Sequence, residues 1–291
     1  MKKLLVMASI SMITALFDGC GPNETAKTAS SPTPAPSNQM VIVGSTTLLP
    51  VAEKAVEAFK KRKQDPKITI NLNGGGSQVG INALVDGLSD IAMSSRDLKE
   101  EEKDKLRKKR MEAKGNIVAW DGIAPIVHPS NPVKNLTIAQ LKDIYTGKVT
   151  NWKEVGGKDG SITVLSRDTT SGTHEVWSEM VLNHEPVVAT AKLRGTSEAV
   201  LEGVATDPSA IGYDGIDYVE GNARVKSVSV EGVKASAAAV ADRSYKIARP
   251  IYMFTRGNPT ALVVEFLEFV LSAEGQALVK EAKFAPVPQK Q

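Results

Sequence analysis

The sequence predicts an α/β fold in which helices cover a mainly parallel sheet. Short runs of β-branched and aliphatic residues alternate along the chain with longer amphipathic segments, a pattern typical of this class. Three of the strand-like runs also end in a loop of Gly, Ser and Thr that leads directly into a helix-like segment. Because ligands bind at the carboxyl ends of the strands in α/β sheets, we expect a binding site where these loops meet.

Length and composition limit the classes of protein that the chain can belong to. Its 291 residues are enough for about two domains with ample buried core. The chain is 42% hydrophobic and 24% charged, as globular proteins are. A net charge of +3 is too small to indicate nucleic acid as the main partner. A single cysteine excludes an intramolecular disulfide.

The first residues have the pattern of a secretory signal. Lys2 and Lys3 precede the apolar run 4–17, which is too short to span a bilayer comfortably, so we expect a signal peptide over residues 1–19. Cys20 follows this run and a small residue directly, which predicts cleavage before it and lipidation of its side chain. The positions just before the cleavage point depart from the usual lipoprotein pattern, so simple secretion is the alternative.

Residues 21–39 are rich in Pro, Ser, Thr and Ala and contain almost no large apolar side chain. Such a segment cannot offset its ordering entropy by burial, so we expect a flexible tether. Together with a lipidated Cys20, it would hold the folded part in the periplasm or at the outer face of the cell membrane.

The first half of the folded part is expected to alternate strands and helices. The segment 51–63 has its apolar residues on one helical face, and in 68–72 every second residue is apolar. Acids and bases interleave over 98–111, which predicts a solvated helix face and not a nucleic-acid surface. Strands are expected at 41–43, 68–72 and 90–93, and helices at 51–63, 81–85 and 98–111.

The second half begins with two apolar runs, 117–120 and 123–128, on either side of Asp121-Gly122. We interpret the interruption as a crossover between domains. Helices are then expected at 138–145, 175–182, 197–205, 261–271 and 273–283, and strands at 162–165, 225–230 and 250–254.

The segment 164–174 has the features of an anion site. A strand-like run is followed by small polar residues and then by a helix, whose first N–H groups have no partner within the helix. Hydroxyls from Ser171 and Thr173 and the charge of Arg167 would join these N–H groups around a tetrahedral oxyanion. The alternative is that Ser171 and Thr173 only cap the helix. Similar loops at 44–50 and 73–80 would bring further helix N-termini to the same point.

Ten short motifs resemble those of one known family. They lie at residues 44–50, 74–77, 90–96, 121–124, 136–141, 145–152, 166–167, 171–173, 211–213 and 249–252. From about Val41 to Pro288, the chain resembles the periplasmic phosphate-binding proteins of phosphate ABC transporters, the PstS type.

This resemblance implies a two-domain periplasmic-binding-protein fold, type II-like, with the ligand cleft between the domains. Two crossover strands would join the domains near 120–123 and 248–252. Domain I would comprise residues 40–121 plus 250–291, and domain II residues 122–249. The resemblance also implies a monomer that binds inorganic phosphate with high affinity and delivers it to the transmembrane permease subunits of an ABC transporter, without a cofactor or metal.

The resemblance also assigns the phosphate-binding residues by position. Thr46 and Thr47 would offer N–H groups, Ser77 a hydroxyl and an N–H group, and Arg167 a charged fork, with residues 171–173 closing the far side. The full predicted set is Thr46, Thr47, Ser77, Ser95, Arg96, Asp121, Arg167, Ser171, Gly172 and Thr173.

Two departures from the family pattern affect the site. Some members have an aspartate at the position of Ser95, and that carboxylate accepts the proton that phosphate carries and sulfate lacks. Asp121 is our candidate for this role here, and an aspartate bonded to nearby backbone at the hinge is the alternative interpretation. His174 stands where related sequences often have arginine, so a second cation there is in doubt.

Other functions remain as alternatives. A hydrolase would use Ser171 with His174 and Asp168, but no Gly-x-Ser-x-Gly elbow precedes the serine, so we expect no enzyme. The histidines 128, 174 and 184 lack metal-ligand spacing. A carrier of sulfate, molybdate or arsenate, or a phosphate sensor that does not take part in transport, would use the same cleft.

Overall fold

The structure is a computed structural model and describes residues 38–288. The predicted signal peptide, the lipidation of Cys20 and nearly all of the tether lie outside the described residues. Strand β1 (Gln39–Gly44) begins where the tether was expected to end. Over residues 38–288, no helix is both long and apolar enough to cross a membrane.

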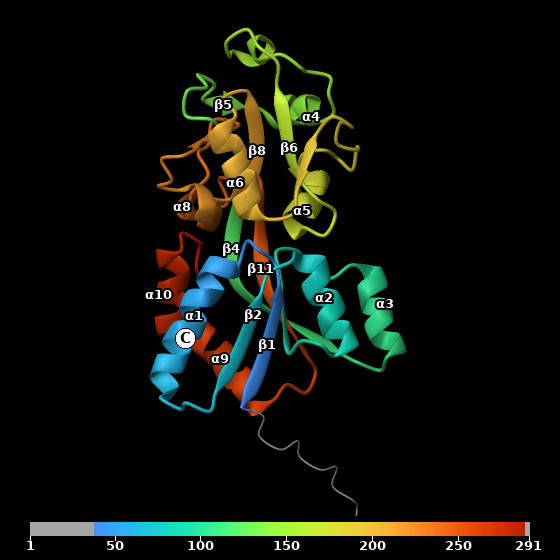
Figure 1. The fold of residues 1–291 in the computed structure, drawn as a ribbon, viewed down its shortest axis with the longest axis vertical. Coiled ribbons are helices and arrows are strands. Elements are labelled where there is room, and N and C mark those ends of the chain that lie inside the picture. Colours follow the sequence, from blue (N-terminus) through green and yellow to red (C-terminus); the bar gives the residue numbers. More distant parts are fainter. Residues whose placement is uncertain (1–37, 289–291) are drawn as a thin grey trace, which may run out of the picture. The chain divides into compact units, whose positions relative to one another are not determined.

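The strands of the central sheet follow the order β2-β1-β3-β11-β4-β8-β6-β7, with β9 beside β4 (Figure 1). Their bounds after β1 are β2 Thr69–Asn73, β3 Ile91–Ser94, β4 Ala113–Val127, β6 Thr163–Arg167, β7 Lys192–Arg194, β8 Ala210–Gly215, β9 Lys226–Ser227 and β11 Ala248–Arg256. A separate parallel pair joins β5 (Asn135–Leu136) and β10 (Ser229–Val230). The predicted single strand at 225–230 is thus two short strands.

The sheet is mixed, which corrects the expectation of a mainly parallel one. β1 pairs in parallel with β2 and β3, and β6 with β7 and β8. In contrast, β4 and β11 run antiparallel to each other and to their neighbours β8 and β3. β4 and β11 carry the chain between the two halves of the sheet in opposite directions, so they run antiparallel to each other.

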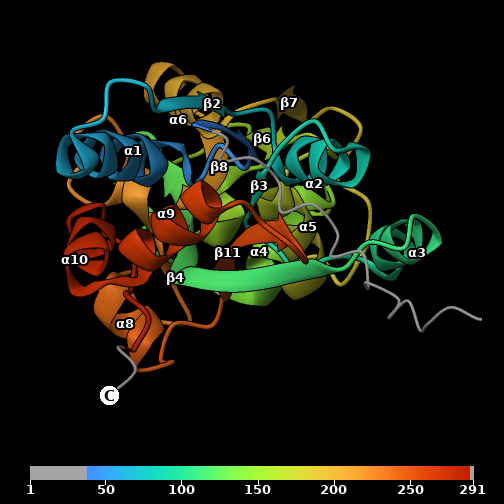
Figure 2. The same cartoon turned by 90° about the horizontal axis from the view of Figure 1, so that it is seen from below.

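Strand β4 passes without interruption through Asp121-Gly122, where the sequence predicted a crossover between domains. It runs for 15 residues and changes its partner from β11 to β8 between Gly122 and Ile123. Figure 2 shows β4 and β11 at the centre of the molecule, viewed from below. They are the two crossover strands expected near 120–123 and 248–252, and Asp121-Gly122 lies within β4.

The first lobe packs helices on both faces of β1, β3 and β11. Because side chains of a strand alternate between faces, Ile91 and Met93 lie in the core with α1, α9 and α10, whereas Ala92 lies in a second cluster with α2. The helix bounds are α1 Leu49–Lys63, α2 Ser77–Asp86, α3 Glu100–Lys108, α9 Ala261–Leu271 and α10 Ala273–Glu281.

The second lobe has its own core around three aromatic side chains in contact. Trp177 lies parallel to Tyr213, with ring centroids 4.3 Å apart, and Tyr145 contacts both. The helices here are α4 Ile138–Tyr145, α5 Gly172–Met180, α6 Ser197–Thr206, α7 Ile216–Val219 and α8 Ala237–Ala241, with a 3-10 turn at Trp152–Val155. The exact domain boundaries given above stay a prediction.

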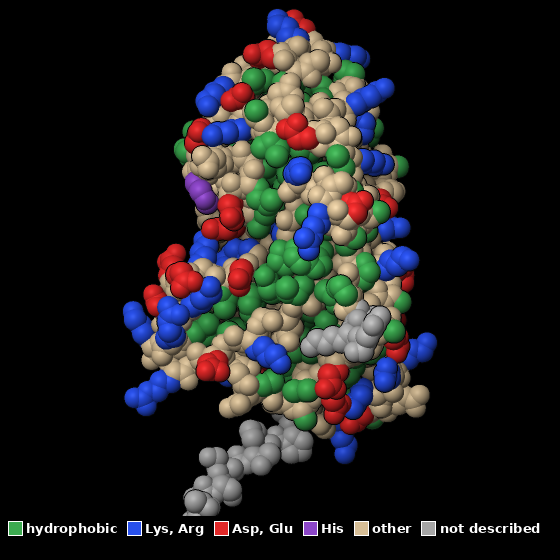
Figure 3. Space-filling view, turned by 180° about the vertical axis from the view of Figure 1, so that it is seen from behind, with side chains coloured by type: hydrophobic (Ala, Val, Ile, Leu, Met, Phe, Trp, Pro, Cys, Tyr) green, Lys and Arg blue, Asp and Glu red, His purple; other side chains and the backbone are tan. Residues whose placement is uncertain are grey.

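The surface carries both signs of charge. Figure 3 shows acidic and basic side chains interspersed, with hydrophobic side chains gathered in the middle of this face. On α3, Lys103 pairs with Glu100 at 2.8 Å, and Arg107 pairs with Asp104. This is the solvated helix face that the interleaved acids and bases predicted.

Candidate functional site

Four helices begin at one place between the lobes, and each brings hydroxyl groups there. Thr46 and Thr47 precede α1, Ser77 opens α2, Ser171 caps α5 and Ser197 opens α6. All five side chains are buried. The N–H groups of a first helical turn carry partial positive charge, so four such ends form a region suited to an anion. We call this region the socket.

The sequence analysis predicted the helix that begins at Ser197 but did not assign this helix start to the site. Its signal was present, because Gly195, Thr196 and Ser197 repeat the pattern of glycine and hydroxyl residues before a helix. The preceding strand, β7, is only three residues long, which hid the strand–loop–helix order.

Arg167 provides the positive charge of the socket. Its Nη2 donates to Thr46 Oγ1 at 3.1 Å, across the two lobes, and its Nη1 donates to Ser197 Oγ at 3.0 Å. Further hydrogen bonds to the carbonyls of Arg194 and Gly195 hold the guanidinium in place. The side chain is 1% exposed, and this burial lowers the pKa of Arg167, although an arginine in a protein stays protonated.

Other predicted residues meet at the same place, either across the two lobes or within the first lobe. The hydroxyls of Thr47 and Thr173 lie 3.0 Å apart, and those of Ser77 and Ser95 lie 3.3 Å apart. Gly172 is so close to these serines that a Cβ atom there would lie 2.4 Å from Ser77 Oγ. Hydroxyl groups of both lobes therefore converge at the start of α5.

One main-chain contact joins the lobes beside the socket. The N–H of Gln78 donates to the carbonyl of Thr170 at 3.0 Å. Gly76, just before α2, has φ +100°, and a Cβ atom there would lie 2.7 Å from the same carbonyl oxygen. A glycine is therefore required for this close approach of two backbones.

Asp121 forms a buried ion pair with Arg249 at the edge of the socket. Arg249 Nη2 and Nε lie 2.8 and 3.2 Å from Asp121 Oδ2, and Nη2 also reaches Thr47 Oγ1 at 3.5 Å. The other oxygen of Asp121 accepts from the N–H of Ile216 at 3.2 Å. Both carboxylate oxygens thus have partners, as in the hinge interpretation. Burial raises the pKa of Asp121, against the effect of the Arg249 charge.

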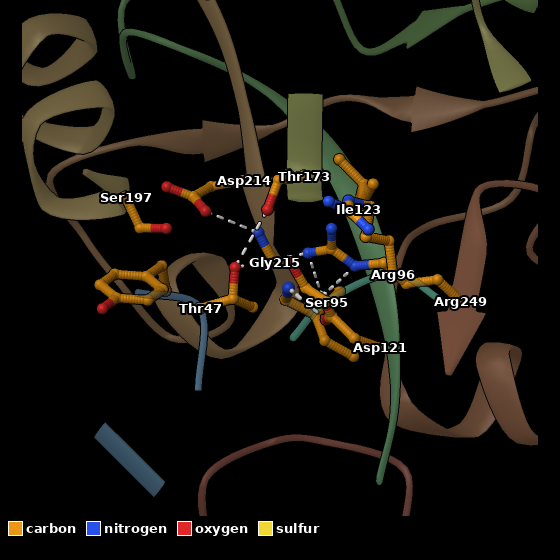
Figure 4. A network of polar contacts seen from close by, with 12 residues as sticks. Thr47, Ser95, Arg96, Asp121, Ile123, Thr173, Ser197, Asp214, Gly215 and Arg249 are labelled. Atoms are coloured by element: carbon orange, nitrogen blue, oxygen red, sulfur yellow. Dashed lines mark hydrogen bonds and ion pairs between the residues drawn. The ribbon is translucent and has the colours of Figure 1, made fainter. Parts of the chain in front are cut away.

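Two further buried acids lie beside this pair, and the sequence analysis assigned neither. Asp214 Oδ1 accepts from the N–H of Gly215 at 2.9 Å, whereas Oδ2 has no hydrogen-bond partner within residues 38–288 (Figure 4). Burial raises the pKa of Asp214 to about 6, and the charge of Arg167 is the main opposing effect. Burial and the negative charge of Asp121 raise the pKa of Asp217 well above its usual range. Asp214 directly follows the motif at 211–213, which was its only sequence signal.

The structure does not bring the Arg96 side chain into the socket. Its Nη1 and Nη2 lie 2.8 and 2.7 Å from the two oxygens of Glu102, and Nη2 also donates to Gln78 Oε1 at 3.0 Å. Arg96 and Glu102 are both nearly fully buried. The predicted charge of Arg96 is therefore compensated by Glu102, whose own pKa this contact lowers.

Ser171, His174 and Asp168 are not arranged as a nucleophile set. Ser171 Oγ accepts from the N–H of His174 at 3.3 Å, as a helix cap does, and His174 Nδ1 faces the Tyr213 hydroxyl at 3.3 Å. Asp168 Oδ1 accepts from the Thr170 N–H at 2.9 Å. Within the described chain, no base is therefore placed to activate the serine.

The socket has the donor groups that a small oxyanion requires. It combines a fixed cation with hydroxyl donors and helix N-termini, all shielded from water, where charge-assisted hydrogen bonds are strong. The nearby buried carboxylates favour an anion that keeps a proton of its own, because a fully ionised anion would face them without a hydrogen bond.

Comparison with known proteins gives consistent matches. A family model described as PBP superfamily domain matches residues 29–274. The chain is 32% identical over 287 residues to the phosphate-binding protein PstS of Bacillus subtilis (strain 168), covering 98% of this chain and 93% of that protein.

Solved structures agree with these matches. One, from Clostridium perfringens, is described as a phosphate ABC transporter substrate-binding protein with bound phosphate. It is 40% identical, covers 86% of this chain and 100% of its own, and superposes with a TM-score of 0.81. An ABC-type phosphate transport receptor from Vibrio cholerae is 30% identical, with the same coverage and a TM-score of 0.69.

Proposed function

The chain belongs to the PstS family of phosphate-binding proteins, within the PBP superfamily, and on this basis we propose that its socket binds inorganic phosphate. The observation that carries the proposal is the position of Arg167. A buried guanidinium donates to one hydroxyl from each lobe, Thr46 and Ser197, at the meeting point of four helix N-termini. A phosphate oxygen would take the place between these donors.

The ligands that we propose come from both lobes. Thr46, Thr47, Ser77 and Ser95 would contact the anion from the first lobe, and Arg167 with residues 171–173 from the second. Ser171 Oγ accepts from the His174 N–H, but its own proton stays available for the anion. We add Ser197 to the predicted set and leave out the side chain of Arg96, whose charge Glu102 compensates.

The number of donors is sufficient for tight binding. A micromolar dissociation constant corresponds to about 8 kcal/mol. A charge-assisted hydrogen bond contributes about 1.5–3 kcal/mol each, so a few such bonds in a site that excludes water would supply this free energy.

We infer that the protein is a binding protein for a phosphate ABC transporter, and not an enzyme. The relatives are named phosphate-binding proteins and transporter substrate-binding proteins. In this role the protein would work outside the cytoplasmic membrane, as a monomer, and would pass phosphate to the permease subunits.

The lipid anchor belongs to this proposal and has its own test. With Cys20 lipidated, the protein should sediment with membranes after cell disruption, whereas a Cys20→Ser variant should be released into the soluble fraction. Equal amounts of both forms in the soluble fraction would contradict anchoring through this residue.

Calorimetric titration of the anion-stripped protein tests the proposed ligand. Phosphate should bind at least as tightly as micromolar, and sulfate should produce no heat at the same concentrations. Arg167→Gln should abolish the binding of phosphate. Arg194→Gln is the matched control, since the guanidinium of Arg194 on neighbouring β7 bonds only its own segment, at the Leu193 carbonyl. Tighter binding of sulfate than of phosphate would overturn the proposal.

A further inference from the structure

We propose that Asp214 accepts a hydrogen bond from the hydroxyl of protonated phosphate and thereby sets the preference for phosphate over sulfate. This inference rests on the proposed function. Asp214 on β8, and not Asp121, would then be the acceptor of the phosphate proton's hydrogen bond. Some family members fill this role with an aspartate at the position of Ser95.

The position of Asp214 on β8 places its side chain at the socket. Residue 213 points into the core of the second lobe, where Tyr213 stacks on Trp177, so the next side chain points to the opposite face. Figure 4 shows the carboxylate of Asp214 directed toward Ser197. Since Ser197 Oγ accepts from Arg167 at 3.0 Å, one hydroxyl separates Asp214 from the cation that would hold the anion.

The hydrogen bonds of the two buried acids distinguish their roles. Asp121 accepts from Arg249 and from the Ile216 N–H, so each of its oxygens already has a donor from the protein. Asp214 uses one oxygen, at the Gly215 N–H, and its Oδ2 has no partner at hydrogen-bond distance within residues 38–288. The Ser197 hydroxyl is the nearby donor that lowers the pKa of this carboxyl. A fully buried acceptor without a donor is destabilising, and a ligand hydroxyl would supply the missing donor.

The chemistry of the group explains why it would discriminate. A hydroxyl such as that of Ser95 both donates and accepts, so it tolerates any oxyanion. An ionised carboxylate only accepts, so it binds phosphate that retains a proton and repels sulfate, which has none. Sites that require such a hydrogen bond can reject the analogue that lacks it by a factor of about 10⁴ to 10⁵.

The groups around Asp214 set its charge. Arg167 on β6, Arg249 on β11 and the Ser197 hydroxyl on α6 favour its ionised form, whereas burial opposes it. The other titratable groups nearby are Asp217 on α7 and the phenols of Tyr213 and Tyr218, whose own pKa values burial and the charge of Asp214 raise. The alternative role is therefore that of a simple counter-ion to Arg167, and the experiment must separate the two.

Asp214→Asn makes this separation, with Asp121→Asn as the matched control. Both substitutions neutralise a fully buried aspartate in one network. If Asp214 is the acceptor, its amide weakens phosphate binding and admits sulfate, so the ratio of the sulfate and phosphate dissociation constants falls at least about 100-fold, while Asp121→Asn keeps the ratio. A counter-ion would change the binding of both anions in parallel and keep the ratio.

The other outcomes are equally informative. If the ratio of the sulfate and phosphate dissociation constants falls only in Asp121→Asn, then Asp121 is the acceptor and the inference is overturned. Wild-type protein that binds no phosphate would refute the proposed function itself, whereas a selective wild type with an equally selective Asp214→Asn refutes only the role of Asp214. If the Asn variant does not unfold cooperatively, Asp214→Ser is measured instead, since its hydroxyl should likewise admit sulfate.

Discussion

Arg249 and Asp121 form an ion pair between the two crossover strands at the point where the chain passes between the lobes. Arg249 Nη2 lies 2.8 Å from Asp121 Oδ2, and the side chains are 2% and 0% exposed. The two residues are also direct neighbours in the antiparallel register of β11 and β4. One residue further along, β4 leaves β11 and pairs with β8. The ion pair therefore fixes the strands where the pairing changes.

Arg249→Met should destabilise the protein strongly. It leaves Asp121 buried without its cation, which costs about 3–5 kcal/mol in comparable cases. Urea unfolding near neutral pH measures this loss. Arg256→Met is the control on the same strand, because the Arg256–Asp90 pair is 3.5 Å apart and partly exposed and should contribute less than about 1 kcal/mol. Equal losses of unfolding free energy in the two variants would show that the buried pair stabilises the protein no more than the exposed pair does.

Gly172→Ala should weaken phosphate binding without unfolding the protein. The new Cβ atom would lie 2.4 Å from Ser77 Oγ and 2.7 Å from Ser95 Oγ, so the lobes could not approach as closely. Affinity should fall at least about tenfold, or 1.4 kcal/mol. Calorimetry gives the affinity and thermal unfolding the stability. Gly160→Ala is the control, because no atom lies within 4 Å of its added Cβ. Unchanged affinity in Gly172→Ala would argue against close contact of the lobes in the bound state.

The stability of the ligand-free protein should depend on pH through Asp214. Its pKa is about 6 in the folded state and about 3.9 in an unfolded chain. The folded state therefore binds the proton more tightly, so the contribution of Asp214 is complete below pH ~4 and is lost as the pH rises toward 6. Relative to Asp214→Asn, wild-type stability should fall over this window. A constant difference between the two proteins from pH 4 to 7 would contradict the raised pKa.

Arg96→Gln should reduce stability but change phosphate affinity by less than about threefold (0.7 kcal/mol). The substitution removes the partner of buried Glu102 and leaves that carboxylate uncompensated. Arg167→Gln serves as the comparison, since it removes the cation of the socket. If Arg96→Gln also abolishes binding while it stays folded, the original prediction that Arg96 is a ligand stands.

Local signals in the sequence were sufficient for many elements. The helices expected at 138–145 and 261–271 have the same bounds as α4 and α9. Thr137 and Thr260 cap them through side-chain hydrogen bonds to the third residue on, so their starts are encoded within a few positions. The burial of Asp121 within β4 was not predictable in this way, because it depends on Arg249 beside it, 128 positions further along.

The same distinction applies to the socket. Hydroxyls at helix starts are local features, so the sequence pointed to Thr46, Ser77 and Ser171. The burial of the charged residues and the distant partner of Asp214 are not local features. Glu102 is only six positions from Arg96, but no periodic pattern indicates that the two are buried as a pair. Asp214 meets Arg167 only through the pairing of β8 with β6. Pair interactions of this kind are fixed by tertiary structure and leave no periodic signal.

The hydrogen bond from the Gln78 N–H to the Thr170 carbonyl is formed by main-chain atoms alone. Substitutions at either position other than Gln78→Pro leave its donor and acceptor in place, so the register in which the lobes meet does not depend on these side chains. The amide proton of Gln78 should also exchange with solvent deuterium only when the lobes separate. This single amide is thus a label-free reporter of opening, readable in the unmodified protein with and without its anion.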